Sequence, residues 1–394
     1  MKNDELEVAD AAIEALLRDH DPQEVSTRAF LDAQFDAGLA WVHFPPGHGG
    51  LGLSRSVQAH VAARLEERAA PSPDTGRNGI GLGMAAPTIA SFGTDEQKTR
   101  FLKPIFTSAE IWCQLFSEPS AGSDLAAVGT RAVRDGDEWR VTGQKVWTSS
   151  AHNADFAILV ARTDPEAPKH RGITYFLCPM RSAGVDVRPL RQLTGEAEFN
   201  EVFLDDVRVP DDYRVGEVGG GWAVANGTLS NERVAIGAAP ERESGHIGIV
   251  ARMWREQPEV RRVARHDHLM KLWVDAEVTR LAGERFRQLS VSGQPGPEGS
   301  ALKLSFAAQA QAITGFALEL DTCRAVQYGE WSMSRPELVS LTGRDAGYRY
   351  LRAKGNSIEG GTSEILRNIV SERVLGLPQE FRSDKDVPWK DLPR

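Results

Sequence analysis

Cysteine is scarce in this chain of 394 residues. The three cysteines, Cys113, Cys178 and Cys323, are odd in number and widely spaced, so they support neither a disulfide framework nor a thiolate metal site. Long apolar runs are also missing, because none approaches the ~18 residues that a membrane-spanning helix needs. The N-terminal stretch MKNDELEVAD is acidic and has no apolar segment of the secretory type. We therefore expect a cytoplasmic protein without a metal site or a membrane span.

Basic residues do not outnumber acidic ones. The chain has 46 Lys and Arg against 55 Asp and Glu, which gives a net charge of −9. This balance argues against a broad nucleic-acid footprint, and no basic cluster of the kind that holds anionic membranes is present. A length of 394 residues favours two or three subdomains over one compact unit.

The periodicity of apolar residues changes twice along the chain. Up to about residue 113 it is helical, and Thr94 with Gln97 forms a capping box ahead of one of these helices. Between about 114 and 214 short alternating or apolar runs such as FAILVAR and GITYFLC predict strands. The remainder is helical again. The sequence therefore predicts an α+β protein, mostly α, with the order helices, strands, helices.

Two sequence patterns resemble functional motifs, but the residues around them do not support that interpretation. The segment GIGLGMAAP (79–87) suggests a dinucleotide loop, yet no strand precedes it, so a loop or close helix packing is the better interpretation. His266 and His268 suggest a metal site, but residues two apart on a helix point to different faces. Neither a nicotinamide site nor a metal site is predicted.

A third pattern, FSEPSAGSDLAA (116–127), is more specific. Pro119 and Gly122 force an irregular backbone, while Ser117, Ser123 and the exposed amides provide many hydrogen-bond donors. Such a loop suits a flat heteroaromatic ring or a phosphate, although an ordinary turn between domains has the same composition. In the later stretch KVWTSS (145–150), Trp147 precedes residues with hydroxyl groups. Together the two motifs suggest that Trp147 packs against one ring and that hydroxyl groups donate hydrogen bonds to the edge of that ring.

FSEPSAGSD, the Trp–Thr–Ser stretch and the C-terminal GGTSEILRNIVSERVLGLP together resemble the acyl-CoA dehydrogenase family. The resemblance runs through FPPGHGGLGLS and FGTDEQKTRFLKPI and covers essentially the whole chain. It implies an N-terminal helical domain (1–113), a middle β domain (114–214) and a C-terminal four-helix bundle domain (215–394). It also implies FAD between the β domain and the bundle, with subunits paired as dimers or dimers of dimers.

The resemblance also assigns roles to individual residues. Ser123 would lie near the substrate as well as the cofactor, and Arg233 would lie near the CoA portion. The residues that it places at the FAD are Phe116, Ser117, Gly122, Ser123, Trp147, Thr148, Ser149, Gly361, Thr362 and Glu364.

The implied reaction oxidises an acyl-CoA thioester to its 2,3-enoyl form, and an electron-transfer flavoprotein accepts the electrons. Two alternatives stay open on the same fold. One is a flavin oxidase or monooxygenase, and the other is a partner subunit of a heteromeric acyl-CoA dehydrogenase.

The position of the catalytic base departs from much of the family. Many members have a glutamate directly before the Gly-Thr pair, where this chain has Gly360, and Glu359 is one residue further back. A one-residue shift in extended or irregular backbone turns a side chain away from its target. A minority of the family carries the base on a bundle helix beside an arginine, and Glu232 with Arg233 stands in that place. We therefore expect Glu232 to be the base, with Glu359 as the alternative.

Two further departures concern the dimer. The family usually has an Arg-x-x-Phe-Gly stretch early in the last domain, whereas this chain has ARMWREQPEVRR (251–262). It also has LELDTCRAV (318–326) where many relatives have a Gly-Gly turn on the same cofactor. Both contacts cross the dimer in relatives, so we expect a heteromeric or otherwise unusual oligomer.

Overall fold

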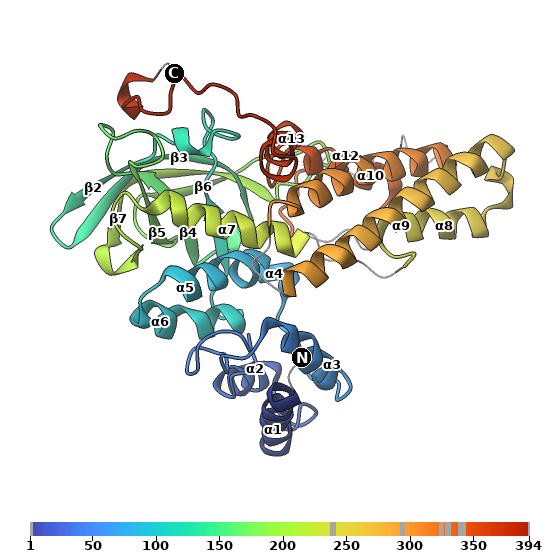
Figure 1. The fold of residues 1–394 in the computed structure, drawn as a ribbon, viewed down its shortest axis with the longest axis horizontal. Coiled ribbons are helices and arrows are strands. Elements are labelled where there is room, and N and C mark those ends of the chain that lie inside the picture. Colours follow the sequence, from blue (N-terminus) through green and yellow to red (C-terminus); the bar gives the residue numbers. More distant parts are fainter. Residues whose placement is uncertain are drawn as a thin grey trace.

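The computed structural model describes residues 3–236, 242–291, 296–322, 327, 332–337 and 344–392. Three parts follow one another along the chain: N-terminal helices, a sheet and a helical bundle. In Figure 1 the N-terminal helices lie below the sheet and the bundle extends to the right. The predicted α+β fold class, with its helical N-terminal domain, middle β domain and C-terminal bundle, is confirmed. None of the described helices combines the length and the apolarity that crossing a membrane requires.

The N-terminal part is built around the predicted capping box. Thr94 Oγ1 accepts a hydrogen bond from the Gln97 N–H at 3.2 Å, and Gln97 Oε1 accepts one from the Thr94 N–H at 3.1 Å. Segment 79–87 is helical, with a π-helical turn at Gly81–Ala85. The helices are α1 (Asn3–Asp19), α2 (Thr27–Asp36), α3 (Gln58–Glu66), α4 (Thr75–Ile80), α5 (Ala86–Phe92) and α6 (Asp95–Phe106).

The middle part is a mixed sheet, eight-stranded among the described residues, in the order β6-β7-β3-β2-β4-β5-β8, with β1 paired to β4 in parallel. The first strand begins at Trp112, slightly before the expected start of the β domain at 114. The strands are β1 (Trp112–Leu115), β2 (Arg131–Asp135), β3 (Glu138–Ser149), β4 (Phe156–Arg162), β5 (Ile173–Pro179), β6 (Val185–Pro189), β7 (Phe199–Pro210) and β8 (Arg214–Val215).

The C-terminal part begins with a helix that lies across the sheet, and the other long helices extend away from it (Figure 1). The helices are α7 (Gly221–Ile236), α8 (Gly245–Glu256), α9 (Val263–Val291), α10 (Gly299–Leu320), α12 (Ala346–Ala353) and α13 (Ser363–Ile369). After α13 the chain returns over the β domain, where Pro388 bridges to Pro168.

A buried hydroxyl junction fixes α7 against both other parts. Thr228 on α7 lies 2.8 Å from the Thr88 hydroxyl on α5 and 3.0 Å from the Tyr175 hydroxyl on β5, measured between oxygen atoms. All three residues are buried, and burial raises the pKa of Tyr175 well above its usual value. Because a buried hydroxyl without a partner is costly, this junction sets the position of α7 along the sheet.

Candidate active site

A β-bulge in β3 presents Trp147 to the solvent. Lys145 and Thr148 on β3 pair with Val202 and Asn200 on β7, so two residues on β3 oppose one on β7. Trp147 has φ +61°, a left-handed conformation that is rare for a bulky residue. Its side chain is 58% exposed, and its ring meets the Phe199 ring edge-on at 5.9 Å between centroids. The bulge therefore leaves the Trp147 ring exposed on the surface of the β domain.

The donor-rich loop begins beside this bulge. The N–H of Val146 donates to the Ser117 carbonyl at 2.9 Å, which joins the predicted loop to the Trp147 segment. The Ser117 and Ser123 hydroxyls have no hydrogen-bond partner in the described part of the chain, and a Cβ at Gly122 would meet open space. The Phe116 ring, in contrast, is buried against Tyr175 in the core. The Phe116 side chain is therefore part of the core.

A buried ion pair anchors the base of the loop. Lys145 Nζ donates to Glu118 Oε1 at 2.8 Å, to the Phe116 carbonyl at 3.0 Å and to the Val160 carbonyl at 2.9 Å. Burial alone would raise the pKa of Glu118, but the Lys145 charge and hydrogen bonds from Thr130 and Gly129 lower it below its usual value. Glu118 therefore stays ionised and serves to hold the loop.

The C-terminal motif forms a turn that leads into α13. Gly360 and Gly361 have φ +62° and +93°, conformations that residues with a side chain rarely adopt. Thr362 caps α13, because its Oγ1 accepts a hydrogen bond from the Ile365 N–H at 3.2 Å. Lys303 on α10 donates to the Gly361 carbonyl at 2.7 Å. Glu364 is exposed and pairs with Arg367 at 3.3 Å.

Phe199 and Arg352 link this motif to the bulge. The Arg352 guanidinium on α12 lies over the Phe199 ring at 5.6 Å, and Phe199 in turn contacts Trp147. Arg352 donates to both oxygens of Glu359, at 3.2 and 3.1 Å, and pairs with Glu198 next to β7 at 3.1 Å. The structure thus brings the Trp147 segment and the Glu359 turn into one connected group.

The Glu359 carboxylate already accepts hydrogen bonds from Arg352 on α12 and from its own turn. Besides the two bonds from Arg352, its Oε1 accepts a hydrogen bond from Asn356 Nδ2 at 2.7 Å, and its own N–H donates to the Gly355 carbonyl at 2.9 Å. Glu232 and Arg233 lie in α7, one turn after Thr228, but their side chains fall outside the part of the chain that the structure describes.

Glu198 is a site residue that the sequence reasoning missed. It is buried, its Oε2 has no partner among the described residues, and burial raises its pKa although Arg352 opposes this. Glu196, two residues earlier, accepts a hydrogen bond from the Tyr348 hydroxyl at 2.7 Å and pairs with Arg344. No local pattern indicates these contacts, because the partners are about 150 residues apart in sequence.

Comparisons with known proteins identify the family. Family models of acyl-CoA dehydrogenase match the N-terminal domain at residues 6–109, the middle domain at 113–207 and the C-terminal domain at 219–375. The chain therefore belongs to the acyl-CoA dehydrogenase family, a class of FAD-dependent oxidoreductases that act on acyl-CoA. The predicted family, enzyme class and cofactor are confirmed.

Two mycobacterial relatives are similar over most of the chain. Acyl-CoA dehydrogenase IpdE1 of Mycobacterium tuberculosis is 38% identical over 374 residues, which cover 93% of this chain and 91% of IpdE1. Acyl-CoA dehydrogenase FadE34 of the same organism is 40% identical over 346 residues, which cover 87% of this chain. The matched part is only 45% of FadE34, so this chain spans less than half of that longer relative.

Solved structures share the fold over nearly the full length. The ChsE4-ChsE5 complex from Mycobacterium tuberculosis matches with a TM-score of 0.69 at 26% identity, covering 96% of this chain and 99% of that one. The Tcur3481-Tcur3483 steroid ACAD matches with a TM-score of 0.70 at 26% identity, again covering 96% of this chain and 99% of that one.

The side chains around the bulge fit an isoalloxazine ring. Thr148, the residue after the exposed Trp147, is buried, and its Oγ1 has no hydrogen-bond partner among the described residues. The free hydroxyls of Ser117 and Ser123 and the partly buried Ser149 add donors for the carbonyl and imide edges of the ring. An exposed aromatic plane with hydroxyl groups on neighbouring segments is the chemistry that suits a flavin ring.

Proposed function

We propose that this chain catalyses the α,β-dehydrogenation of an acyl-CoA thioester to the 2,3-enoyl-CoA. FAD, held by loop 116–123, by Trp147, Thr148 and Ser149, and by the turn at Gly361, Thr362 and Glu364, supplies the acceptor for the β-hydrogen. The observation that supports this most is the bulge that presents Trp147 beside the donor-rich loop. The protein holds the α- and β-carbons between base and cofactor, which removes most of the orientational cost of the reaction.

The proposed base is Glu232 on α7. Its competitor Glu359 already accepts three hydrogen bonds, two from Arg352 and one from Asn356, so proton abstraction by Glu359 would disrupt a formed ion pair. Position 360, where much of the family has its base, has φ +62° and is occupied by glycine. The Thr228 junction holds α7 in place one turn before Glu232. Arg233 is proposed to contact the CoA portion, and Ser123 the thioester end.

Two isosteric variants distinguish these bases. Glu232→Gln is expected to abolish reduction of the bound flavin by acyl-CoA while the flavin stays bound, and Glu359→Gln is expected to retain much of it. Anaerobic stopped-flow absorbance measures the reduction, and the flavin spectrum before mixing reports occupancy. The opposite pattern in the two variants would identify Glu359 as the base.

The proposed electron acceptor is an electron-transfer flavoprotein. After anaerobic reduction by substrate, the enzyme is expected to reoxidise slowly in air and quickly with such a flavoprotein. Rapid reoxidation in air alone would assign the chain to the oxidase class.

The proposed assembly is a homo- or hetero-oligomer, with a second subunit type as the favoured form. The missing Phe-Gly motif falls in α8 and the turn after it, and segment 318–326 lies partly outside the described residues. The ChsE4-ChsE5 complex is a solved relative made of two named chains. Purification of this chain alone as a fully flavinated, active homotetramer would contradict the heteromeric form.

A further inference from the structure

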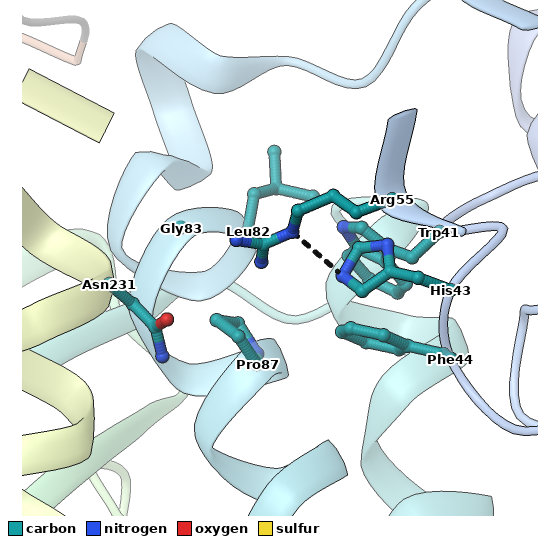
Figure 2. Close-up of a pocket in the computed structure, with 8 residues that line it drawn as sticks. All are labelled: Trp41, His43, Phe44, Arg55, Leu82, Gly83, Pro87 and Asn231. Atoms are coloured by element: carbon teal, nitrogen blue, oxygen red, sulfur yellow. Dashed lines mark hydrogen bonds between the residues drawn. The ribbon is translucent and has the colours of Figure 1, made fainter. Parts of the chain in front are cut away.

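A cavity of ≈ 150 Å³ lies between the N-terminal helical domain and α7 (Figure 2). Its aromatic wall is formed by Trp41 and Phe44, whose rings stack at 4.9 Å between centroids. Leu82 and Pro87, from the helical segment that the sequence presented as a glycine-rich loop, add apolar surface. A cavity of this volume accommodates a group of about the size of benzene.

Unused donors converge on this cavity from opposite walls. The Arg55 and Asn231 side chains point toward each other across it (Figure 2). The Arg55 Nε–H donates to His43 Nε2 at 3.4 Å, which leaves both outer nitrogens of the guanidinium without a partner among the described residues. The Asn231 amide likewise has no hydrogen-bond partner in that part of the chain.

Arg55 is an exposed residue, and no carboxylate whose side chain the structure describes lies within ion-pair distance of its guanidinium. His43 cannot act as a second cation at neutral pH, because burial and the Arg55 charge lower its pKa to about 4. One planar cation with two free N–H edges and one free amide is a set of donors that matches a carboxylate, which Arg binds in bidentate geometry.

The cavity reaches α7 at the level of the proposed base. Asn231, which lines the cavity, immediately precedes Glu232 on this helix. We propose that the cavity receives the far end of the acyl group and that this end bears a carboxylate. The substrate class is then the CoA monothioester of a dicarboxylic acid with a compact or cyclic skeleton. This inference rests on the proposed function.

Calorimetric titration of the FAD-loaded enzyme with unreactive thioesters tests the inference. The probes are 3-thia acyl-CoA pairs of six, eight and ten carbons, with either a terminal carboxylate or a terminal methyl group. Sulfur at the β-position prevents formation of the 2,3-alkene, so binding is measured without turnover. At the best-fitting length, Arg55→Met is expected to weaken binding of the acidic thioester roughly 10- to 100-fold, as for loss of a hydrogen bond between charged groups. Binding of the neutral thioester is expected to stay within about 3-fold in the same variant.

Two further variants control for charge and for folding. Arg55→Lys keeps the charge but not the planar fork, and is expected to recover part of the acidic binding. Arg77→Met removes an exposed arginine of the same domain that does not line the cavity, and is expected to change neither probe. Equal loss of both probes in Arg55→Met, or tighter wild-type binding of the neutral probe, would overturn the acidic subsite alone. Binding of neither probe by the wild type would contradict the proposed function as well.

Discussion

The buried pair of Lys145 and Glu118 provides a direct test of how the flavin loop is held. Lys145 is fully buried, and each of its three N–H donors has an acceptor: Glu118, the Phe116 carbonyl and the Val160 carbonyl. Lys145→Met preserves most of the side-chain volume while it removes the charge and all three donors. We expect this change to lower the free energy of unfolding and to loosen the loop.

The expected loss follows from what the substitution leaves behind. Breaking a buried ion pair by removing one partner costs about 3–5 kcal/mol, because the other charge remains uncompensated. Glu118 still accepts hydrogen bonds from the Gly129 N–H at 2.7 Å and the Thr130 N–H at 2.9 Å, which favours the lower end of that range. Folded proteins are stable by about 5–15 kcal/mol, so this loss is large.

Urea unfolding followed by tryptophan fluorescence measures this loss, and visible absorbance measures flavin retention in the same samples. The double variant Lys145→Met with Glu118→Gln removes the uncompensated charge and is expected to recover part of the stability. Lys271→Met breaks an exposed ion pair with Asp267 at 2.8 Å and is expected to have no measurable effect. A single variant within about 1 kcal/mol of wild type, or a double variant no more stable than the single one, would refute the charge argument.

The Lys145–Glu118 pair also predicts how the free energy of unfolding depends on pH. Because the folded-state pKa of Glu118 is lowered, its contribution to stability is present above the unfolded pKa of ~4.3 and is lost as the pH falls through the folded value. Without Lys145, burial is the dominant influence and raises that pKa. A folded-state pKa above the unfolded value reverses the sign of the Glu118 contribution, which then stabilises the fold as the pH falls. The stability deficit of Lys145→Met relative to wild type, measured by urea unfolding, is therefore expected to shrink as the pH falls toward and below ~4.3.

Three further substitutions probe the site and its supports. Trp147→Ala is expected to weaken flavin retention or to alter the visible spectrum, and full occupancy with an unchanged spectrum would count against the placement of the ring. Thr362→Ala removes the N-cap of α13 and is expected to cost about 1 kcal/mol in urea unfolding, with Thr362→Ser close to wild type. Trp389→Ala removes a hydrogen bond to the Ala127 carbonyl at 3.0 Å and a ring 4.8 Å from the Arg162 guanidinium. Faster proteolysis of the C-terminal segment is expected, and an unchanged cleavage rate would show that other contacts hold it.

Features that depend on neighbouring residues were predictable from the sequence. The capping box at Thr94 and Gln97 formed with both of its hydrogen bonds, and the strands appeared where the periodicity changed. The glycine-rich segment 79–87 was expected to be a loop or a site of close helix packing; it is helical, and no described strand precedes it. These features depend on local backbone preferences, which can be inferred from the neighbouring residues in the sequence.

Features that depend on distant partners were not predictable. In the sequence, Lys145 is one polar residue of an alternating strand pattern. It contacts Glu118, 27 residues away in sequence, only because the strand and the loop pack together in the fold. The left-handed conformation of Trp147 follows from a bulge that depends on the register of β7. The Arg55 side chain reaches the cavity only because the N-terminal domain packs beside α7. Each of these properties belongs to a pairing between elements.

The position of Glu359 shows how adjacency in sequence and adjacency in space can suggest different roles. In sequence it stands beside two glycines, as a catalytic base would. In the structure Arg352 lies between Glu359 and Glu198 and compensates both carboxylates, while its guanidinium rests on Phe199 beneath the Trp147 bulge. Withdrawing Glu359 to take a proton would leave Arg352 shared with Glu198 alone and would disturb the contact that joins the C-terminal turn to the β domain. The geometry therefore favours Glu359 as the residue that fixes this turn, in keeping with the proposal that Glu232 on α7 takes the proton.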